Sequence, residues 1–458
     1  MGLLKIIKEY HRQKKRLNFN RDRLLKYQDN EFRKLLKHAW NNTDFYKEFY
    51  SNHGIKYTDL KNIKPENLPP INKELVMDNF TDILTSKNFK ANELEEFLKN
   101  NKKPGLKFRD KYKILHTSGT SGNIGIYIFS NQEWDFIKAN TLRIYPEGFP
   151  LKRQKTAYIG AVDGNYAGVN IFMASQSGVE KIFFKEPLLI DIKRPIQDQL
   201  NALESEDPDL LSGYSQGLEE LASFKLSGQL NIKPDLLISG GEPLTKSQIQ
   251  TIKEAWPESN IVDYYAASES PLLGIDKLNN QGMLLFEDLN LFEIDDEGYY
   301  LTPLYKYFQP LIRYKMNDLL VEKSSDKNIK NGYKRIKKLA GRDEETPVFL
   351  SKEGEKISIH PIIFVEFYTP GLEKFKLIQT DKDSFDFYIK LNPGYDYQKI
   401  IDNIKDELNN LLNAKKLSNV DYKIKDLKTL NDKQSRSSGK FKLIEKTEAA
   451  AEFSKNYK

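Results

Sequence analysis

The sequence predicts an α/β fold, with a large N-terminal domain of mostly parallel, helix-covered sheets and a small, mobile α+β C-terminal domain. Apolar strand-like segments alternate with helical segments between residues 112 and 320, which is typical of parallel sheets covered by helices. Glycine-rich turns follow two of these strands, around Gly119 and Gly240, and ligands bind where the strands of such sheets end. After Arg342 the pattern changes to a strand pair and one long amphipathic helix.

The composition indicates a folded protein and excludes several kinds of site. With 458 residues and 39% hydrophobic content, the chain is long enough for more than one domain. It has no cysteine and only five histidines, which excludes disulfides and thiolate metal sites and argues against a His-rich metal site. No stretch approaches the ~18 consecutive apolar residues of a membrane span, and the N-terminus lacks the features of a signal peptide. We therefore expect a cytoplasmic protein.

The net charge of +6 is concentrated at the N-terminus. Residues 1–27 carry nine Lys or Arg against Glu9 and Asp22, a net of +7, which leaves the rest of the chain close to neutral. With its apolar residues between positions 3 and 7, this segment either contacts acidic lipid or, more commonly, forms a solvated helix packed on its own protein. Nucleic-acid binding is not expected, because the basic excess does not continue along the chain.

The first hundred residues are predicted to be mainly helical. Apolar residues recur at three- and four-residue spacing within residues 21–50, which predicts a helix there. Residues 68–74 read Leu-Pro-Pro-Ile-Asn-Lys-Glu, a proline-bounded turn in which Asn72 is placed to cap the next helix. A polar connection then leads into a predicted strand over residues 112–115.

The stretch from His116 to Gly125, His-Thr-Ser-Gly-Thr-Ser-Gly-Asn-Ile-Gly, follows that strand directly. Small hydroxyl residues between glycines present N–H and O–H donors to an anion such as a triphosphate. The stretch is neither a GxxxxGK[ST] loop nor a GxGxxG loop. On these residues alone, a flexible surface loop is an equally good interpretation.

The segments that follow alternate between the two periodicities. Strands are predicted over residues 156–160, 181–184, 235–239 and 261–265, and helices over residues 196–205, 216–224 and 246–256, with a short apolar run at 209–211. Beyond a boundary placed between residues 340 and 341, the segments 374–379 and 384–391 are a predicted strand pair, 397–414 a predicted helix and 421–424 a further strand. The predicted domains are therefore 1–340 and 341–458.

Five further motifs stand in a recognisable order. They are Ser-Gly-Gly-Glu-Pro at 239–243, Asp-Tyr-Tyr-Ala-Ala-Ser-Glu at 263–269, Pro-Leu-Ile-Arg-Tyr-Lys-Met-Asn-Asp at 310–318, Gly-Arg-Asp-Glu at 341–344 and Ser-Gly-Lys at 438–440. Together with the loop after His116, they resemble the adenylate-forming superfamily, and specifically its phenylacetate–CoA ligase family, including the branch encoded with capsule-polysaccharide genes. Residues 44–47 and 68–75 resemble that family's early motifs, so the resemblance covers nearly the whole chain.

The resemblance implies a reaction and a nucleotide site. Such enzymes use ATP to convert a carboxylic acid into acyl-AMP with release of pyrophosphate, and then transfer the acyl group, usually to CoA. The phosphates of ATP would be held by Thr117, Ser118, Gly119, Thr120, Ser121 and Gly122. The nucleotide would further contact Gly241, Glu242, Pro243, Tyr265, Ser268, Asp318 and Arg342, with Tyr265 stacked on adenine and Asp318 accepting both ribose hydroxyls.

Three further roles follow from the resemblance. Glu269 would hold Mg²⁺, a hard cation that prefers carboxylate and phosphate oxygens. Asp343 and Glu344 would lie at the hinge between the domains. Lys440 would be the catalytic residue, its ammonium stabilising the charge that grows between the substrate carboxylate and the α-phosphate. On sequence grounds alone, Tyr265 is almost equally well a sheet-core aromatic, and Arg313 is equally well a ligand or a structural ion-pair residue.

The leading hypothesis is therefore an ATP- and Mg²⁺-dependent acid–thiol ligase with CoA as acceptor. The first alternative is an amide ligase that transfers the acyl group to an amine, for example in surface-polysaccharide modification. The second is a catalytically inactive nucleotide-binding or scaffold protein. The family's usual Gly after the stacking Tyr is Ala266 here, and its Thr-Gly before the ribose Asp is Met316-Asn317. The extra bulk at Ala266 argues against phenylacetate itself as the acid. Relatives are often dimers, so a homodimer is also an expectation.

Overall fold

The structure is a computed structural model that describes residues 3–101, 103–117, 125–145, 153–162, 164–174, 184–241, 244, 246–279, 281–295, 298–316, 318–323, 331–340, 347–359, 363–364, 367, 369, 371–391, 396–430 and 444–455. The chain divides into two compact units. The first comprises Met1–His116, Gly125–Ile190 and Leu203–Gly341, and the second comprises Thr117–Ile124, Asp191–Ala202 and Arg342–Lys458.

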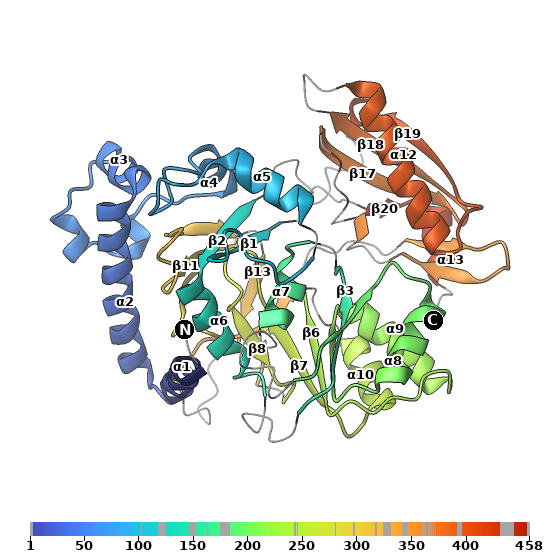
Figure 1. Ribbon diagram of the computed structural model, residues 1–458, viewed down its shortest axis with the longest axis horizontal. Coiled ribbons are helices and arrows are strands. Elements are labelled where there is room, and N and C mark those ends of the chain that lie inside the picture. The colour runs from blue at the N-terminus through green and yellow to red at the C-terminus, as the bar shows by residue number, and fades with distance from the viewer. Residues whose placement is uncertain are drawn as a thin grey trace. The chain divides into compact units, whose positions relative to one another are not determined.

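The elements follow one another in a mixed order of helices and strands (Figure 1). The helices are α1 (Leu3–Arg16), α2 (Arg21–Asn42), α3 (Asp44–Asn52), η1 (Asp59–Lys61), η2 (Pro65–Asn67), α4 (Lys73–Asp78), α5 (Ala91–Asn100), α6 (Asn131–Thr141), α7 (Ala167–Ala174), α8 (Ile196–Glu206), α9 (Ser215–Leu226), α10 (Lys246–Ala255), α12 (Tyr397–Ala414), η4 (Leu427–Thr429) and α13 (Glu448–Lys455). The η elements are short 3-10 helices.

The strands form separate sheets. They are β1 (Tyr112–His116), β2 (Ile126–Ser130), β3 (Thr156–Gly160), β4 (Leu188–Asp191), β5 (Leu210–Gly213), β6 (Leu236–Gly240), β7 (Asn260–Tyr265), β8 (Gly274–Asp276), β9 (Met283–Leu285), β10 (Asn290–Asp295), β11 (Gly298–Pro303), β12 (Tyr314–Met316), β13 (Leu319–Glu322), β14 (Arg335–Ala340), β15 (Val348–Leu350), β16 (Lys356–Ser358), β17 (Leu372–Asp381), β18 (Ser384–Leu391), β19 (Asp421–Asp426) and β20 (Ile444–Lys446).

A nine-stranded sheet in the order β13-β14-β9-β8-β7-β6-β5-β3-β4 is the largest of the described sheets. Strands β3, β5, β6 and β7 are parallel neighbours, and α9 packs on this part of the sheet with α10 beside it (Figure 1). The predicted α/β class is therefore confirmed. Beyond β7, the strands β8, β9, β14 and β13 are antiparallel to their neighbours, however, and their three- to six-residue lengths left no periodic signal in the sequence.

The strand before the Thr/Ser/Gly stretch lies outside that sheet. The predicted strand is present as β1, but β1 pairs antiparallel with β2, with His116 opposite Ile126, in a two-stranded sheet of its own. The expectation that both glycine-rich turns end strands of one parallel sheet is thus wrong for the first turn and right for Gly240, the last residue of β6. A hairpin forms because β2 follows β1 closely in sequence.

The predicted helix over residues 21–50 is two helices. The chain breaks at Thr43, whose backbone is extended and whose hydroxyl donates to Ala39 O at 2.8 Å. The same hydroxyl oxygen accepts from Tyr46 N at 3.2 Å and so caps α3. Thr43 thus forms hydrogen bonds with a backbone carbonyl at the end of α2 and a backbone N–H at the start of α3. The helix therefore ends there, although the apolar spacing by itself predicts one continuous helix.

The early motifs pack on a motif more than 200 residues later. The Tyr46 hydroxyl donates to Pro310 O at 3.0 Å and accepts from Ile312 N at 2.9 Å. Ile71 forms a parallel bridge with Tyr314. The predicted cap is also confirmed, because Asn72 accepts from Leu75 N at 2.8 Å at the start of α4. These early segments therefore support the strand that leads to Asp318.

The second unit contains a four-stranded sheet in the order β19-β18-β17-β20. The predicted strand pair is the antiparallel pair of β17 and β18, and the predicted third strand is β19. Helix α12 covers the predicted residues and buries the apolar stripe that predicted it: Ile400, Ile401, Ile404, Leu408, Leu411 and Leu412.

Two remaining expectations concern single segments. Residues 181–183 of the predicted strand 181–184 lie outside the described residues, and Phe184 forms an isolated bridge with Gln154. Among the described residues, none of the helices combines the length and the apolar character that crossing a bilayer requires.

Candidate active site

Four motifs that are far apart in the sequence meet in the first unit. Gly240, at the end of β6, is paired with Tyr264 of β7. The Ser268 hydroxyl, which follows β7, donates to His116 O at the end of β1, 3.1 Å away. Asp318 accepts from the Tyr265 hydroxyl at 2.7 Å. The turn after β6, the segment 263–269, the end of β1 and the segment 310–318 therefore surround one place.

Tyr265 joins two of these motifs through its hydroxyl. Besides donating to Asp318 Oδ2, that hydroxyl lies 2.6 Å from the hydroxyl of Tyr299 on β11. Tyr265 and Tyr299 are 6% and 1% exposed. Burial raises the pKa of both tyrosines well above the ordinary value, and the nearby Asp318 adds to the effect, so both hydroxyls keep their protons. Asp318 is thereby held in one orientation while remaining partly exposed.

Glu269 is a buried carboxylate held by tyrosine hydroxyls. Tyr127 of β2 donates to Glu269 Oε1 at 2.9 Å, and the Tyr314 hydroxyl lies 3.2 Å from the same oxygen. The two hydroxyls are 2.7 Å apart. Burial raises the pKa of Glu269, and the two hydroxyl contacts act in the opposite direction. Burying a carboxylate is costly unless a cation or donors compensate it, so this arrangement is suited to a cation.

The donor set near Glu269 fits Mg²⁺ bound together with phosphate. Among the described residues there is no group of three His, Cys, Asp or Glu that would hold a metal by protein ligands alone. Mg²⁺ commonly binds through one or two carboxylates, with phosphate oxygens and water completing its octahedron. Glu269 fits this pattern, because both tyrosine hydroxyls contact the same oxygen, Oε1, and neither of them forms a hydrogen bond with Oε2. Its role as a metal ligand stays a prediction.

Gly241 has a structural reason to be glycine. Its φ of +86° is in the left-handed region, and a Cβ placed there would lie 2.8 Å from Cε1 of Tyr214. A side chain would therefore be strained and would clash with that ring. The ring of Tyr214 therefore lies next to this turn. The resemblance explained the glycine only by the close approach of adenine.

Lys306 is a buried cation beside the Glu269 loop that sequence reasoning missed. Its Nζ lies 3.4 Å from Glu269 O and 3.7 Å from the centroid of the Phe129 ring. Burial lowers the pKa of Lys306 to about 7, although Glu133 and Glu269 oppose that change. The next two backbone N–H groups donate to Glu133 Oε1 at 2.6 and 2.7 Å, which fixes the segment that carries the lysine.

Arg313 is a structural residue, which decides between the two interpretations left open for it. Its Nε lies 3.0 Å from Glu293 Oε2, and its Nη1 donates to Leu68 O at 2.5 Å. Its guanidinium lies 4.7 Å from the centroid of the Tyr300 ring. The side chain thus links the proline-bounded turn to β10 and β11. The backbone of Arg313 is in the left-handed region, with φ of +56°.

The remaining predicted site residues, apart from Thr117, lie outside the described residues. They are Ser118, Gly119, Thr120, Ser121, Gly122, Glu242, Pro243, Arg342, Asp343, Glu344 and Lys440. Thr117 follows His116 directly. Three other residues that sequence reasoning missed, Tyr127, Tyr299 and Tyr314, share one signal. Each is a tyrosine on a strand whose other residues on the same face are hydrophobic. Tyrosine buried there needs a partner for its hydroxyl.

Comparison with known proteins concerns the fold of the whole chain. No protein-family model matches the chain. Protein CapK of Staphylococcus aureus is 22% identical over 424 residues, covering 88% of this chain and 86% of CapK. A structure of 2-hydroxyisobutyryl-CoA ligase with 2-HIB-AMP and CoA in the thioesterification state matches with a TM-score of 0.58 and 15% identity, covering 94% of this chain and 91% of that chain.

A second structure of that ligase, in the postadenylation state with R3-HIB-AMP, has a TM-score of 0.57 and 16% identity, covering 93% of this chain and 91% of that chain. This protein therefore has the fold of an adenylate-forming acyl-CoA ligase. The resemblance predicted from the order of the motifs is confirmed at the level of the fold.

Proposed function

We propose that this protein is an ATP-dependent ligase that activates an organic acid as acyl-AMP, with release of pyrophosphate, and transfers the acyl group to CoA. The observation that carries the proposal is the convergence of the four motifs around Tyr265, Ser268, Glu269 and Asp318. These segments are separated by up to about 200 residues of chain, and nothing local requires them to meet. Their meeting is what a nucleotide site built from those motifs needs.

The geometry supports distinct roles for the described residues. Asp318 accepts from Tyr265 on Oδ2, and its partly exposed carboxylate suits it to accept the ribose hydroxyls. Glu269 would hold Mg²⁺, which when bound neutralises phosphate charge. The roles of Lys440, which would stabilise the charge growing at the α-phosphate, and of residues 117–122, which would hold the outgoing pyrophosphate, come from the resemblance.

The proposal is tested by acid-dependent exchange of pyrophosphate into ATP, screened over aryl, aliphatic, amino and sugar acids. At least one acid should support exchange, and exchange should require Mg²⁺. If the correctly folded protein binds ATP yet shows no exchange with any class of acid, the proposal fails and the inactive nucleotide-binding interpretation replaces it.

An amine is the second candidate acceptor, and the resemblance to the capsule branch motivates it. The two functions share the first half-reaction and differ only in what attacks acyl-AMP. Pre-formed acyl-AMP should be offered CoA and a panel of amines, including amino sugars, with the products identified by mass spectrometry. A thioester supports the first function, whereas an amide without any thioester supports the second.

We also propose that residues 341–458 form a domain that moves between the two half-reactions, since the site must present Lys440 first and admit the acceptor afterwards. Small-angle scattering should differ between the protein alone and the protein with a bound acyl-AMP analogue. Identical profiles would contradict the movement and leave the adenylation chemistry untouched.

A further inference from the structure

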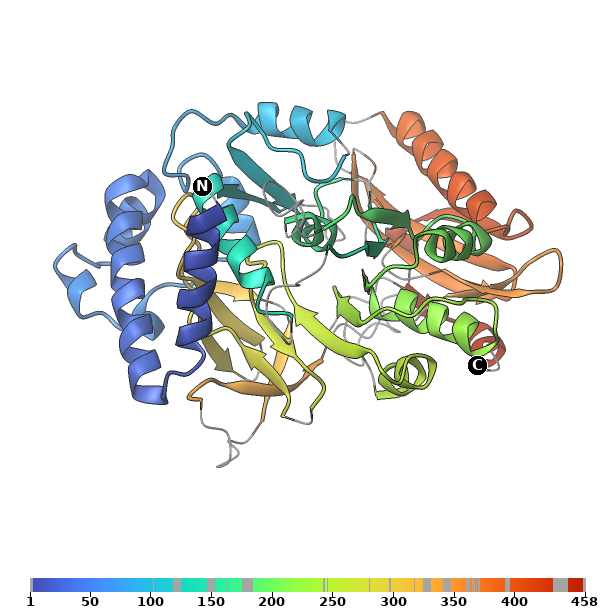
Figure 2. The same ribbon diagram turned by 60° about the horizontal axis from the view of Figure 1, so that its bottom comes forward.

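Helix α1 has an inner face that packs on the protein. Ile6 and Tyr10 are 3% and 5% exposed and form a small core with Ala139 and Leu142 at the end of α6. Gln13, on the same face, donates to Phe136 O at 3.3 Å. Figure 2 shows α1, in dark blue next to the N label, lying beside the blue-green α6. The prediction that the basic N-terminal segment forms a helix packed on its own protein is therefore confirmed.

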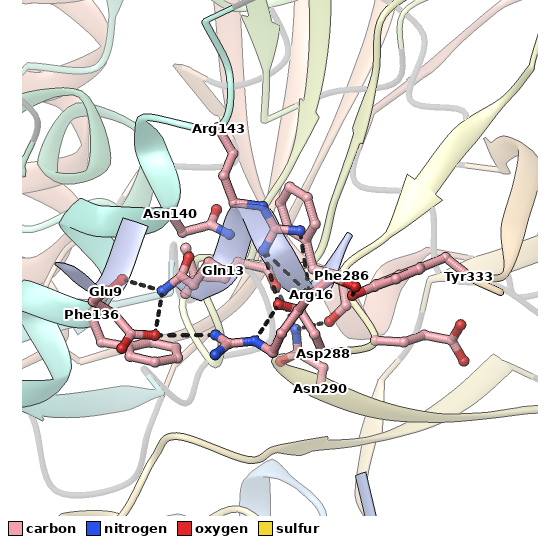
Figure 3. Close-up of polar contacts among 12 residues, drawn as sticks. Glu9, Gln13, Arg16, Phe136, Asn140, Arg143, Phe286, Asp288, Asn290 and Tyr333 are labelled. Carbon is pink, nitrogen blue, oxygen red and sulfur yellow. Dashed lines mark hydrogen bonds and ion pairs between the residues drawn. The ribbon is translucent and has the colours of Figure 1, made fainter. Parts of the chain in front are cut away.

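A buried ion cluster fixes the end of this helix. Arg16, the last residue of α1, places Nε 3.0 Å from Asp288 Oδ2 and Nη2 3.1 Å from Glu9 Oε1. Arg143 approaches the same Asp288 carboxylate with Nη1 3.2 Å from each oxygen. Figure 3 shows the two guanidinium groups converging on Asp288. Because Asp288 is 1% exposed, breaking this cluster would be costly, so α1 cannot roll about its axis.

The outer face of α1 is basic and carries uncovered apolar groups. Leu4 is 83% exposed. A shallow, open depression lies between the side chains of this face, lined by Leu4, Ile7, Lys8, His11, Arg12 and Lys15. These residues follow three- and four-residue spacing, so they form one stripe along the helix. Lys5 and Lys14 are also exposed.

The charge on this outer face is of one sign among the described residues of α1. The helix carries one acidic residue, Glu9, and Glu9 is engaged with Arg16 and Gln13 on the inner side. Arg12 lies 3.6 Å from Glu9 with a side chain that is 60% exposed, which leaves most of it in solvent. Lys277 lies close enough to Lys14 for the two charges to interact, which adds to the positive potential.

We propose that the outer face of α1 docks this protein on the surface of an anionic lipid bilayer. Basic side chains flanking one or two apolar residues on a fixed helix fit a layer of negative headgroups above hydrocarbon. A second copy of this chain is disfavoured as occupant, because two such faces would repel. A nucleic acid would pair with the basic side chains but would leave the exposed Leu4 without an apolar partner. Docking is peripheral, since α1 has 14 residues, too few to span a bilayer.

The test is co-sedimentation of the full-length protein with vesicles of phosphatidylglycerol and phosphatidylcholine, compared with vesicles of phosphatidylcholine alone. The test variant is Lys5→Glu, Lys8→Glu and Lys15→Glu together. The control is Lys26→Glu, Lys37→Glu and Lys47→Glu together, which are exposed residues of α2 and α3. Both triple variants change the net charge of +6 to zero, so they differ only in where the charge is removed. A third variant is Leu4→Ser.

The wild-type protein should bind the anionic vesicles and not the neutral ones, and binding should fall in 1 M salt. Each basic residue near an anionic bilayer contributes about fivefold to the affinity, so the test variant should bind the anionic vesicles about 100-fold more weakly. Leu4→Ser should lose about tenfold, and the control should stay within about threefold. All variants should keep the wild-type melting temperature and pyrophosphate exchange, which separates this proposal from the proposed catalytic function.

Three kinds of result would overturn the proposal. The first kind is equal binding to neutral vesicles, or equal loss in both triple variants, because binding would then not depend on this face. Another is a concentration-dependent dimer in sedimentation velocity that the α1 variant alone abolishes, which would identify the occupant as a second copy. A third is binding of a DNA oligonucleotide that the α1 variant weakens, with vesicle binding absent.

Discussion

Replacement of Tyr265 by Phe tests whether the link between Tyr265 and Asp318 builds the nucleotide site. The change removes one hydroxyl and keeps the ring, so the proposed stacking on adenine would be preserved. Asp318 loses the donor at 2.7 Å that orients its carboxylate, and Tyr299, which is 1% exposed, loses its partner at 2.6 Å. Hydrogen bonds to charged groups contribute about 1.5–3 kcal/mol. We expect a value near the lower limit, because water can partly replace the donor at a half-buried Asp318.

A loss of about 1.5 kcal/mol corresponds to roughly a tenfold rise in the KM for ATP. The assay is pyrophosphate exchange at saturating acid with ATP varied. The turnover at saturating ATP should change much less, since the role proposed for Asp318 is to bind and orient the ribose.

Tyr264→Phe is the matched control. Tyr264 is the neighbouring buried tyrosine, and its hydroxyl donates to Pro271 O at 2.8 Å, away from Asp318. Its loss should lower the melting temperature to a similar degree and leave the KM for ATP unchanged. The reasoning is refuted if Tyr265→Phe keeps a wild-type KM for ATP, or if both variants raise that KM equally.

Three further changes have defined outcomes. Lys440→Ala should abolish pyrophosphate exchange while ATP still binds in calorimetry; undiminished exchange would remove Lys440 from the mechanism. Because burial lowers the pKa of Lys306 to about 7 in the folded state, the unfolded chain binds more protons between that pH and about 10, so stability should rise with pH there. In Lys306→Met, the free energy of unfolding measured by urea titration should rise by up to about 3 kcal/mol less between pH 7 and 9.5 than in the wild type. An equal pH dependence in the two proteins would contradict the burial argument. Asn72→Ala removes the cap of α4 and should cost about 1 kcal/mol of unfolding free energy, with exchange unaffected.

Local pattern was enough to predict the elements whose signal repeats. Helix α12 was predicted with its bounds, because six buried apolar residues recur along it at helical spacing. Strands β6 and β7 were predicted because each is an apolar run followed by a turn motif. The short antiparallel strands from β8 to β14 were missed, since they have only three to six residues and their pairing depends on segments far along the chain.

The sequence by itself determined the fold class, the parallel core of the large sheet and the order of the motifs that indicate an adenylate-forming ligase. Only the tertiary structure decided how those motifs are joined: Tyr265 to Asp318, Ser268 to His116, and Glu269 to Tyr127 and Tyr314. Each of these contacts spans between 45 and 152 residues of chain, a separation at which no local periodicity carries information. Whether a hydroxyl on one strand reaches a carboxylate on another depends on sheet order and burial, and these are properties of the folded chain.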